Sequence, residues 1–181
     1  MGALASLDAE VRLIKRFLKA LGDLLADSDY VSLDPQELAP ALAFIELFIV
    51  DYHERREEEI LFAYLSGRGI TTDDLGQFPL IAHGVDHITL LEFGDAMRSP
   101  DSEAASTLPW NAQLYLRHAR QHVESEEELY RRLRKRLSNE ALLEVAAQLN
   151  DAFPHAEEIH EMAEALLHTL ETRGHPWANS A

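Results

Sequence analysis

Apolar residues recur along most of the chain at spacings of three and four, the period of an α-helix with one buried face. The clearest example is residues 6–26, where leucine, valine or isoleucine stands at positions 7, 11, 14, 18, 21 and 25. No segment shows a sustained alternation of apolar and polar residues rich in β-branched side chains, which would indicate a strand. The pattern therefore predicts an all-α protein.

Capping residues, prolines and glycines divide this pattern into four long helices and two shorter ones. We expect the long helices at about residues 6–26, 34–66, 72 or 79 to 98, and 107–137, and the shorter ones at 138–150 and 153–173. Asp34 and Ser138 have the side chains that favour helix N-caps. Short connections between long helices predict an up-down-up-down four-helix bundle over residues 1–137. We expect residues 138–181 to form a C-terminal helical extension packed on the same domain.

Composition restricts the chemistry and the partners. The chain has 181 residues, a formal net charge of -16 and no cysteine, so its metal ligands would be imidazole and carboxylate groups. An acidic chain repels phosphate backbones, which argues against a nucleic-acid partner. The most apolar stretch, 39–50, is too short to span a membrane, and the first ten residues lack a secretory signature. We therefore expect a cytoplasmic protein with no membrane association.

Three of the predicted long helices carry histidines and glutamates at spacings of four. Such residues lie one above the other on one face of a helix. The second, third and fourth helices each present a pair or a triplet, which consists of His53 and Glu57, His83 and His87, and His118, His122 and Glu126.

These polar groups interrupt apolar stripes in the middle of each helix and are therefore expected to point inward. An isolated pair with this spacing is most often an ordinary surface pair, but three such helices in one bundle favour a common partner. A buried carboxylate is costly unless it is paired or binds a metal. The set therefore predicts a metal site.

Other residues of similar chemistry are expected in other roles. Aromatic residues near these histidines and glutamates are expected to be core residues, with ligation of a metal as the alternative (Tyr52, Tyr64 and Tyr115). The C-terminal histidines are expected at the surface or in packing (His155, His160, His168 and His175).

Two segments resemble one known family. Residues 52–62, with His53 and Glu57 followed by Leu-Phe, and residues 122–129, with His122 and Glu126, are similar to the His-x-x-x-Glu motifs of hemerythrin-like (HHE cation-binding) domains. The resemblance implies a four-helix bundle with a non-haem centre of two iron ions bridged by carboxylates, although zinc or manganese are possible metals. It implies His53 and His122 as terminal ligands, Glu57 and Glu126 as bridges, and His87 with His83 as ligands from the third helix.

The first helix departs from the family pattern because it contains no histidine. The position of the family's first ligand aligns with Val11, directly after Glu10. Either His118, one turn before His122, or Glu10 would replace the missing ligand; otherwise the site would be under-ligated or hold a single metal ion.

The resemblance implies a protein that binds O2, NO or peroxide, or that senses or stores iron. Two alternatives stay open. The same centre would also suit an enzyme that turns over NO or peroxide or repairs iron centres. The missing histidine would suit a helical interaction module that has lost its metal.

Overall fold

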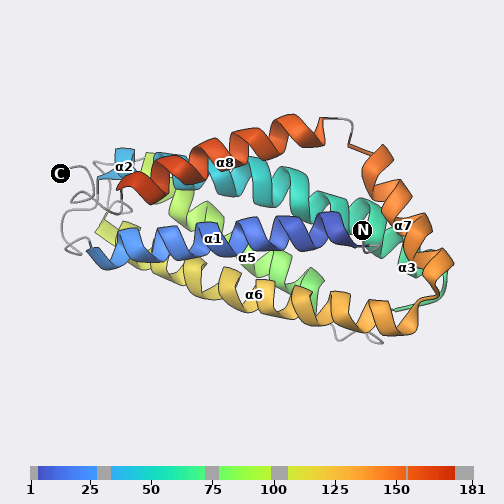
Figure 1. Cartoon of the computed structure of the whole chain (residues 1–181). Coiled ribbons are helices and arrows are strands. Elements are labelled where there is room, and N and C mark those ends of the chain that lie inside the picture. Colours follow the sequence, from blue (N-terminus) through green and yellow to red (C-terminus); the bar gives the residue numbers. More distant parts are fainter. Residues whose placement is uncertain (1–3, 28–33, 72–77, 99–105, 154, 174–181) are drawn as a thin grey trace.

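The computed structural model describes residues 4–27, 34–71, 78–98, 106–153 and 155–173, and almost all of them are helical (Figure 1). No strand occurs within these ranges, so the predicted all-α fold is confirmed. None of the described helices is both long and apolar enough to cross a membrane. The helices with regular geometry are α1 (Ala5–Asp27), α2 (Pro35–Phe44), α3 (Ala63–Gly67), α5 (Phe78–Arg98), α6 (Leu108–Arg136), α7 (Asn139–Asp151) and α8 (Ala156–Arg173).

The second long helix is a continuous rod whose middle is π-helical. After α2 the rod continues as η1 (Ile45–Glu54) and η2 (Glu57–Phe62) before it ends in α3. Its start is fixed by Asp34, whose side chain accepts a hydrogen bond from the Gln36 amide at 2.8 Å. The periodicity predicts the rod but not the π-helical turns. In a π-helical turn the hydrogen bonds join residues five apart, so each turn contains more residues than in an α-helix. The directions of successive side chains therefore differ by a smaller angle.

Four long helices, namely α1, the rod, α5 and α6, run side by side and form the predicted four-helix bundle (Figure 1). Helix α6 packs between α1 and α5, and α2 packs on α5. Rings from two of the units meet in the core, where Phe17 and Phe44 stack with their centroids 4.3 Å apart. The bundle also buries polar residues, from Glu10 of α1 to Glu126 of α6, among leucine, isoleucine and aromatic side chains.

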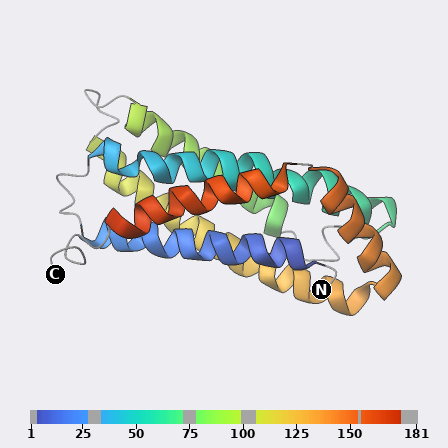
Figure 2. The same ribbon diagram turned by 45° about the horizontal axis from the view of Figure 1, so that its top comes forward.

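The last two helices contribute to the same core. Helix α7 begins at Ser138, whose hydroxyl accepts a hydrogen bond from the Ala141 amide, as its predicted cap role requires. Helix α8 lies between α1 and the rod (Figure 2) and packs on α1, α2 and η1. The buried face of α8 includes Ala163, Leu167 and Leu170, all fully buried. Residues after the bundle therefore pack between α1 and the rod and add to the core of the first four helices.

Candidate metal centre

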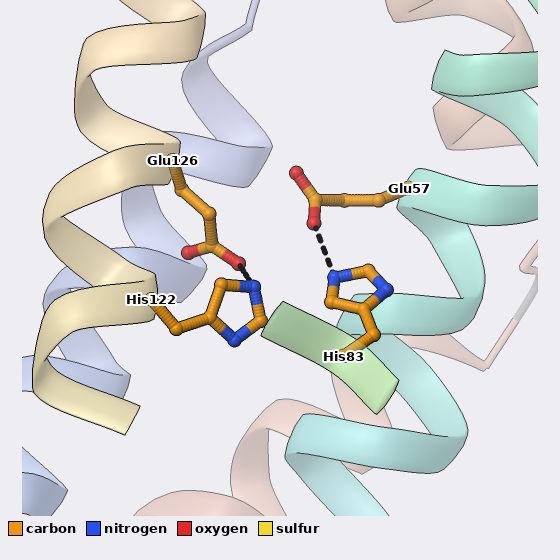
Figure 3. Close-up of side chains that lie close together, drawn as sticks. All are labelled: Glu57, His83, His122 and Glu126. Carbon is orange, nitrogen blue, oxygen red and sulfur yellow. Dashed lines mark ion pairs between the residues drawn. The ribbon is translucent and has the colours of Figure 1, made fainter. Parts of the chain in front are cut away.

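Two histidines and two glutamates from three elements converge in the interior of the bundle. Glu57 comes from η2, His83 from α5, and His122 and Glu126 from α6 (Figure 3). Each offers one ligand atom, and these four atoms lie within 4.8 Å of one another. All four side chains are buried.

The atoms that face one another in this group are poorly satisfied by the protein itself. His83 Nε2 lies 3.3 Å from Glu57 Oε2, and His122 Nε2 lies 2.9 Å from Glu126 Oε1. Nevertheless both Nε2 atoms, Glu57 Oε2 and Glu126 Oε2 are buried without a hydrogen-bond partner, because close approach alone does not give hydrogen-bond geometry. Buried polar atoms without partners are costly, and each of these four neighbouring side chains has one, so the group is suited to a cation. The donor set therefore fits a metal ion.

His53 extends the group toward α1. Its Nε2 lies 3.3 Å from Glu126 Oε1, and its Nδ1 lies 2.9 Å from Oε2 of Glu10. The other oxygen of Glu10 accepts a hydrogen bond from the buried guanidinium of Arg56. Arg56 also donates to the Leu149 carbonyl of α7 at 3.0 Å. Both oxygens of Glu10 are therefore already engaged, and His53 is held between two carboxylates.

Carboxylates also orient the other two histidines. His83 Nδ1 lies 2.7 Å from Glu58 Oε1, and His122 Nδ1 lies 2.7 Å from Asp86 Oδ2. A carboxylate at Nδ1 fixes the imidazole ring and leaves Nε2 free for a metal. Glu57 is held similarly, since the Tyr130 hydroxyl donates to its Oε1 at 2.5 Å. The residues around the centre thus hold the ligand atoms in place.

The carboxylates also determine the protonation of the imidazoles when no metal is bound. Burial lowers the pKa of His53, but Glu126 and Glu10 outweigh burial, and this pKa stands well above its ordinary value. The pKa of His122 is likewise raised, because Glu126 and Asp86 outweigh burial. Burial raises the pKa of Glu126, but His122 and His53 more than reverse this and lower it well below its usual range. Protons therefore occupy the place of a cation, and a metal would displace them.

Buried charge is strongly unbalanced around the group. Five carboxylates are buried there, and among the described residues Arg56 is the buried side chain with a permanent positive charge. With the carboxylates ionised and the imidazoles neutral, as metal binding requires, this leaves an excess of four negative charges, which two divalent cations would neutralise. The five carboxylates are those of Glu10, Glu54, Glu57, Asp86 and Glu126.

The seven residues singled out from the sequence occupy different places. Five of them lie in or directly beside the cluster, namely His53, Glu57, His83, His122 and Glu126. His87 is half exposed, and its Nε2 lies 2.8 Å from Glu54 Oε2. His118 is partly buried on α6 and belongs to neither group of described residues that could hold a metal.

Several residues of the centre were not singled out from the sequence. Arg56 and Glu54 are buried because the π-helical turns bring four of five consecutive residues, 53–57, into the interior, and regular helical spacing gives no sign of this. Tyr130 follows Glu126 by four residues, so the same spacing that identified the ligand pairs could have found it. Glu10, one of the two replacements considered, is fully buried, and Val11 beside it is 2% exposed.

The tyrosines and C-terminal histidines lie around the centre in other roles. Tyr52 and Tyr115 are buried, and burial raises the pKa of Tyr52 to about 12. The Tyr64 hydroxyl donates to the Ala141 carbonyl at 3.0 Å. His160 packs its ring edge-on against Phe48 and Tyr52. His155 and His168 are exposed, and His175 lies outside the described residues.

A family model described as the hemerythrin HHE cation-binding domain matches residues 3–133. This match covers more than half of the chain and includes every residue of the cluster. No curated protein and no solved structure matches the chain.

Proposed function

Because the chain belongs to the hemerythrin HHE cation-binding family, we propose that it is a metalloprotein whose centre holds two iron ions and binds a small oxidant such as O2, NO or peroxide. The observation that carries this proposal is the convergence of four buried ligand side chains, each of which has a buried nitrogen or oxygen without a hydrogen-bond partner. An imidazole and carboxylate donor set without thiolate suits iron, and also zinc or manganese. Bound ferrous iron would supply electrons and a coordination position for the oxidant.

In this proposal His53, His83 and His122 would be terminal ligands, and Glu57 and Glu126 would be the carboxylates shared by the two ions. Two ions agree with the buried charge, since two divalent cations would neutralise the excess of four negative charges. His87 and His118 are not included, because the first lies on Glu54 near the surface and the second lies outside the cluster. Glu10 is not a ligand either, because Arg56 and His53 engage both of its oxygens.

The protein's own residues contribute orientation and exclusion of water. The carboxylates of Glu58 and Asp86 hold the Nδ1 atoms of His83 and His122, so that the opposite nitrogens face the ions. The Tyr130 hydroxyl keeps a proton beside Glu57, because burial, followed by the neighbouring Glu57 and Glu126, raises the pKa of this phenol well above its ordinary value. Apolar side chains above and below the layer keep bulk water out. The cytoplasmic location stays a prediction from composition.

Metal content tests the proposal directly. The protein is purified without metal, reconstituted anaerobically with Fe2+, desalted and measured by elemental analysis, with two ions per chain expected. His122→Ala should lose them, whereas His160→Ala, a histidine of α8 that packs on aromatic rings, should keep both. Exposure of the reconstituted protein to O2, NO and peroxide in turn, followed by absorption spectroscopy, then identifies the oxidant.

Two results would overturn the proposal. Wild-type protein that binds no metal stoichiometrically would favour the metal-free interaction module. Equal loss in both histidine variants would mean that the metal lies in another layer.

A further inference from the structure

A second group of buried ligand atoms adjoins the centre on the α5 side. Glu54 of η1, Asp86 of α5 and His122 each offer one ligand atom, and these atoms lie within 4.8 Å of one another. Glu54 is 2% exposed and Asp86 is 4% exposed. Neither carboxylate belongs to the four-residue cluster of Glu57, His83, His122 and Glu126.

Each of these two carboxylates has one oxygen engaged and one without a partner. Glu54 Oε2 lies 2.8 Å from His87 Nε2, and Asp86 Oδ2 lies 2.7 Å from His122 Nδ1. The remaining oxygens, Glu54 Oε1 and Asp86 Oδ1, are buried without a hydrogen-bond partner. Each carboxylate thus keeps one buried and desolvated oxygen, and carboxylate oxygen is a preferred ligand of divalent metals, so the pair favours a cation.

The position also has a defined place between solvent and the centre. His87, which contacts Glu54, has a side chain that is 45% exposed, and so has Glu58, which contacts His83. Asp86 on the inner side touches His122, a member of the four-residue cluster. A series of ligand-type side chains therefore leads from the surface to the buried ligand atoms.

We propose that Glu54 and Asp86 form an outer cation position, which receives a divalent metal ion from solvent and passes it to the centre. This inference rests on the proposed function, because a loading position has a purpose only if the centre binds metal. It adds a site that the sequence pattern does not mark.

Charge explains why occupancy of the outer position is transient. Before loading, the buried carboxylates outnumber the buried guanidinium, and the protons bound beside them offset only part of this difference, so cations are attracted to this side of the bundle. Once two divalent ions fill the centre, the buried charge is balanced, and a third ion at Glu54 and Asp86 would leave two positive charges in excess. The outer position is therefore strongest while the centre is incomplete.

The rate at which the centre fills tests the inference. Metal-free protein is mixed with Co2+, whose absorption reports coordination by imidazole and carboxylate. Samples are quenched with chelator, and the bound metal is counted after desalting. Glu54→Gln should slow filling by about tenfold or more, as expected when a charge that focuses cations is removed, and should leave the final stoichiometry unchanged.

Glu59→Gln is the matched control. Glu59 lies on the next turns of the same rod, is exposed and pairs with Arg55, so its removal should leave the filling rate at the wild-type value. His87→Ala should not slow filling, since it uncovers Glu54 without removing a carboxylate. If Glu54→Gln does not fold, Glu54→Asp, which withdraws the carboxylate by one methylene group, should slow the same step.

Each other outcome overturns the inference in a distinguishable way. Equal filling rates of wild type and Glu54→Gln would exclude a role of Glu54 in loading. A lower final stoichiometry in Glu54→Gln would make Glu54 a ligand of the centre itself. Equal slowing by Glu59→Gln would attribute loading to the general acidity of the surface. Failure of the wild type to bind Co2+ at all would instead refute the proposed function.

Discussion

The buried carboxylates on the two sides of the centre are compensated in different ways. On the α1 side, the buried carboxylate of Glu10 is compensated by a buried guanidinium from its own chain, Arg56, and its other oxygen contacts His53. On the α5 side, Glu54 and Asp86 each keep an oxygen without a partner, and no permanently charged cation is buried beside them within the described ranges. On the α1 side the chain supplies the cation itself, whereas on the α5 side two carboxylate oxygens are left for an added cation to bind.

The largest expected effect comes from removing the internal cation. Arg56→Met removes the guanidinium that pairs with the buried Glu10 carboxylate and should lower the free energy of unfolding of the metal-free protein by about 3–5 kcal/mol. Denaturation by urea, followed by circular dichroism, measures this.

Arg55 offers an adjacent control for the same experiment. It is exposed and pairs with Glu59 one turn away, so Arg55→Met should cost less than about 1 kcal/mol. Equal and small losses in the two variants would mean that Glu10 is not charged in the folded protein.

A smaller effect is expected when the charge of Glu10 is removed but its shape is kept. Glu10→Gln weakens the contact that orients His53, so metal affinity should fall by about 10–100-fold. Competition with a chelator of known affinity measures the change. Asp23→Asn, which alters an exposed ion pair with Lys19 on the same helix, should leave the affinity as it is. Unchanged affinity in Glu10→Gln would show that Glu10 acts only on stability.

The smallest effect concerns pH, and its sign differs between the metal-free and the loaded protein. Burial lowers the pKa of His83, but Glu57 and Glu54 outweigh it, so this pKa, like those of His53 and His122, is raised in the folded state. A raised pKa adds stability that is complete below the ordinary value of about 6.5 and is lost as pH rises through the folded value. The metal-free protein should therefore lose stability as pH rises above about 6.5.

The loaded protein should behave in the opposite way, because metal binding requires neutral imidazoles and strengthens as pH rises. Unfolding with chelator and with saturating metal, measured across this range, compares the two slopes. Slopes of the same sign would contradict the assignment of these histidines as ligands.

The comparison also explains which parts of the molecule the sequence could predict. Helical periodicity and caps such as Asp34 and Ser138 are local, and the helices and bundle they predict are confirmed. Inward pairs at spacings of four identified His53 with Glu57 and His122 with Glu126, because both pairs interrupt apolar stripes. These signals rest on regular helical geometry.

Where the geometry is irregular, the same rule fails. In the π-helical rod, Glu54 and Arg56 turn inward although regular spacing would put them on other faces. His83 and His87 are four residues apart and look alike in the sequence pattern. His83 is buried in the cluster, whereas His87 is half exposed, and it is Asp86 that contacts His122 from this helix. Which residues of α5 face the cluster depends on how this helix is rotated about its axis relative to its neighbours, and the local sequence does not show that rotation.

The hydrogen bond from Arg56 to the carbonyl of Leu149 has a further consequence for the size of the folding unit. The recognisable family region ends at residue 133, but the buried guanidinium beside the centre is held partly by α7, and α8 closes the core between α1 and the rod. A chain shortened to the family region would therefore lack part of what holds Arg56 and would expose the apolar faces of α1 and α2. For this protein, the segment that cooperates in folding is longer than the segment that identifies its family.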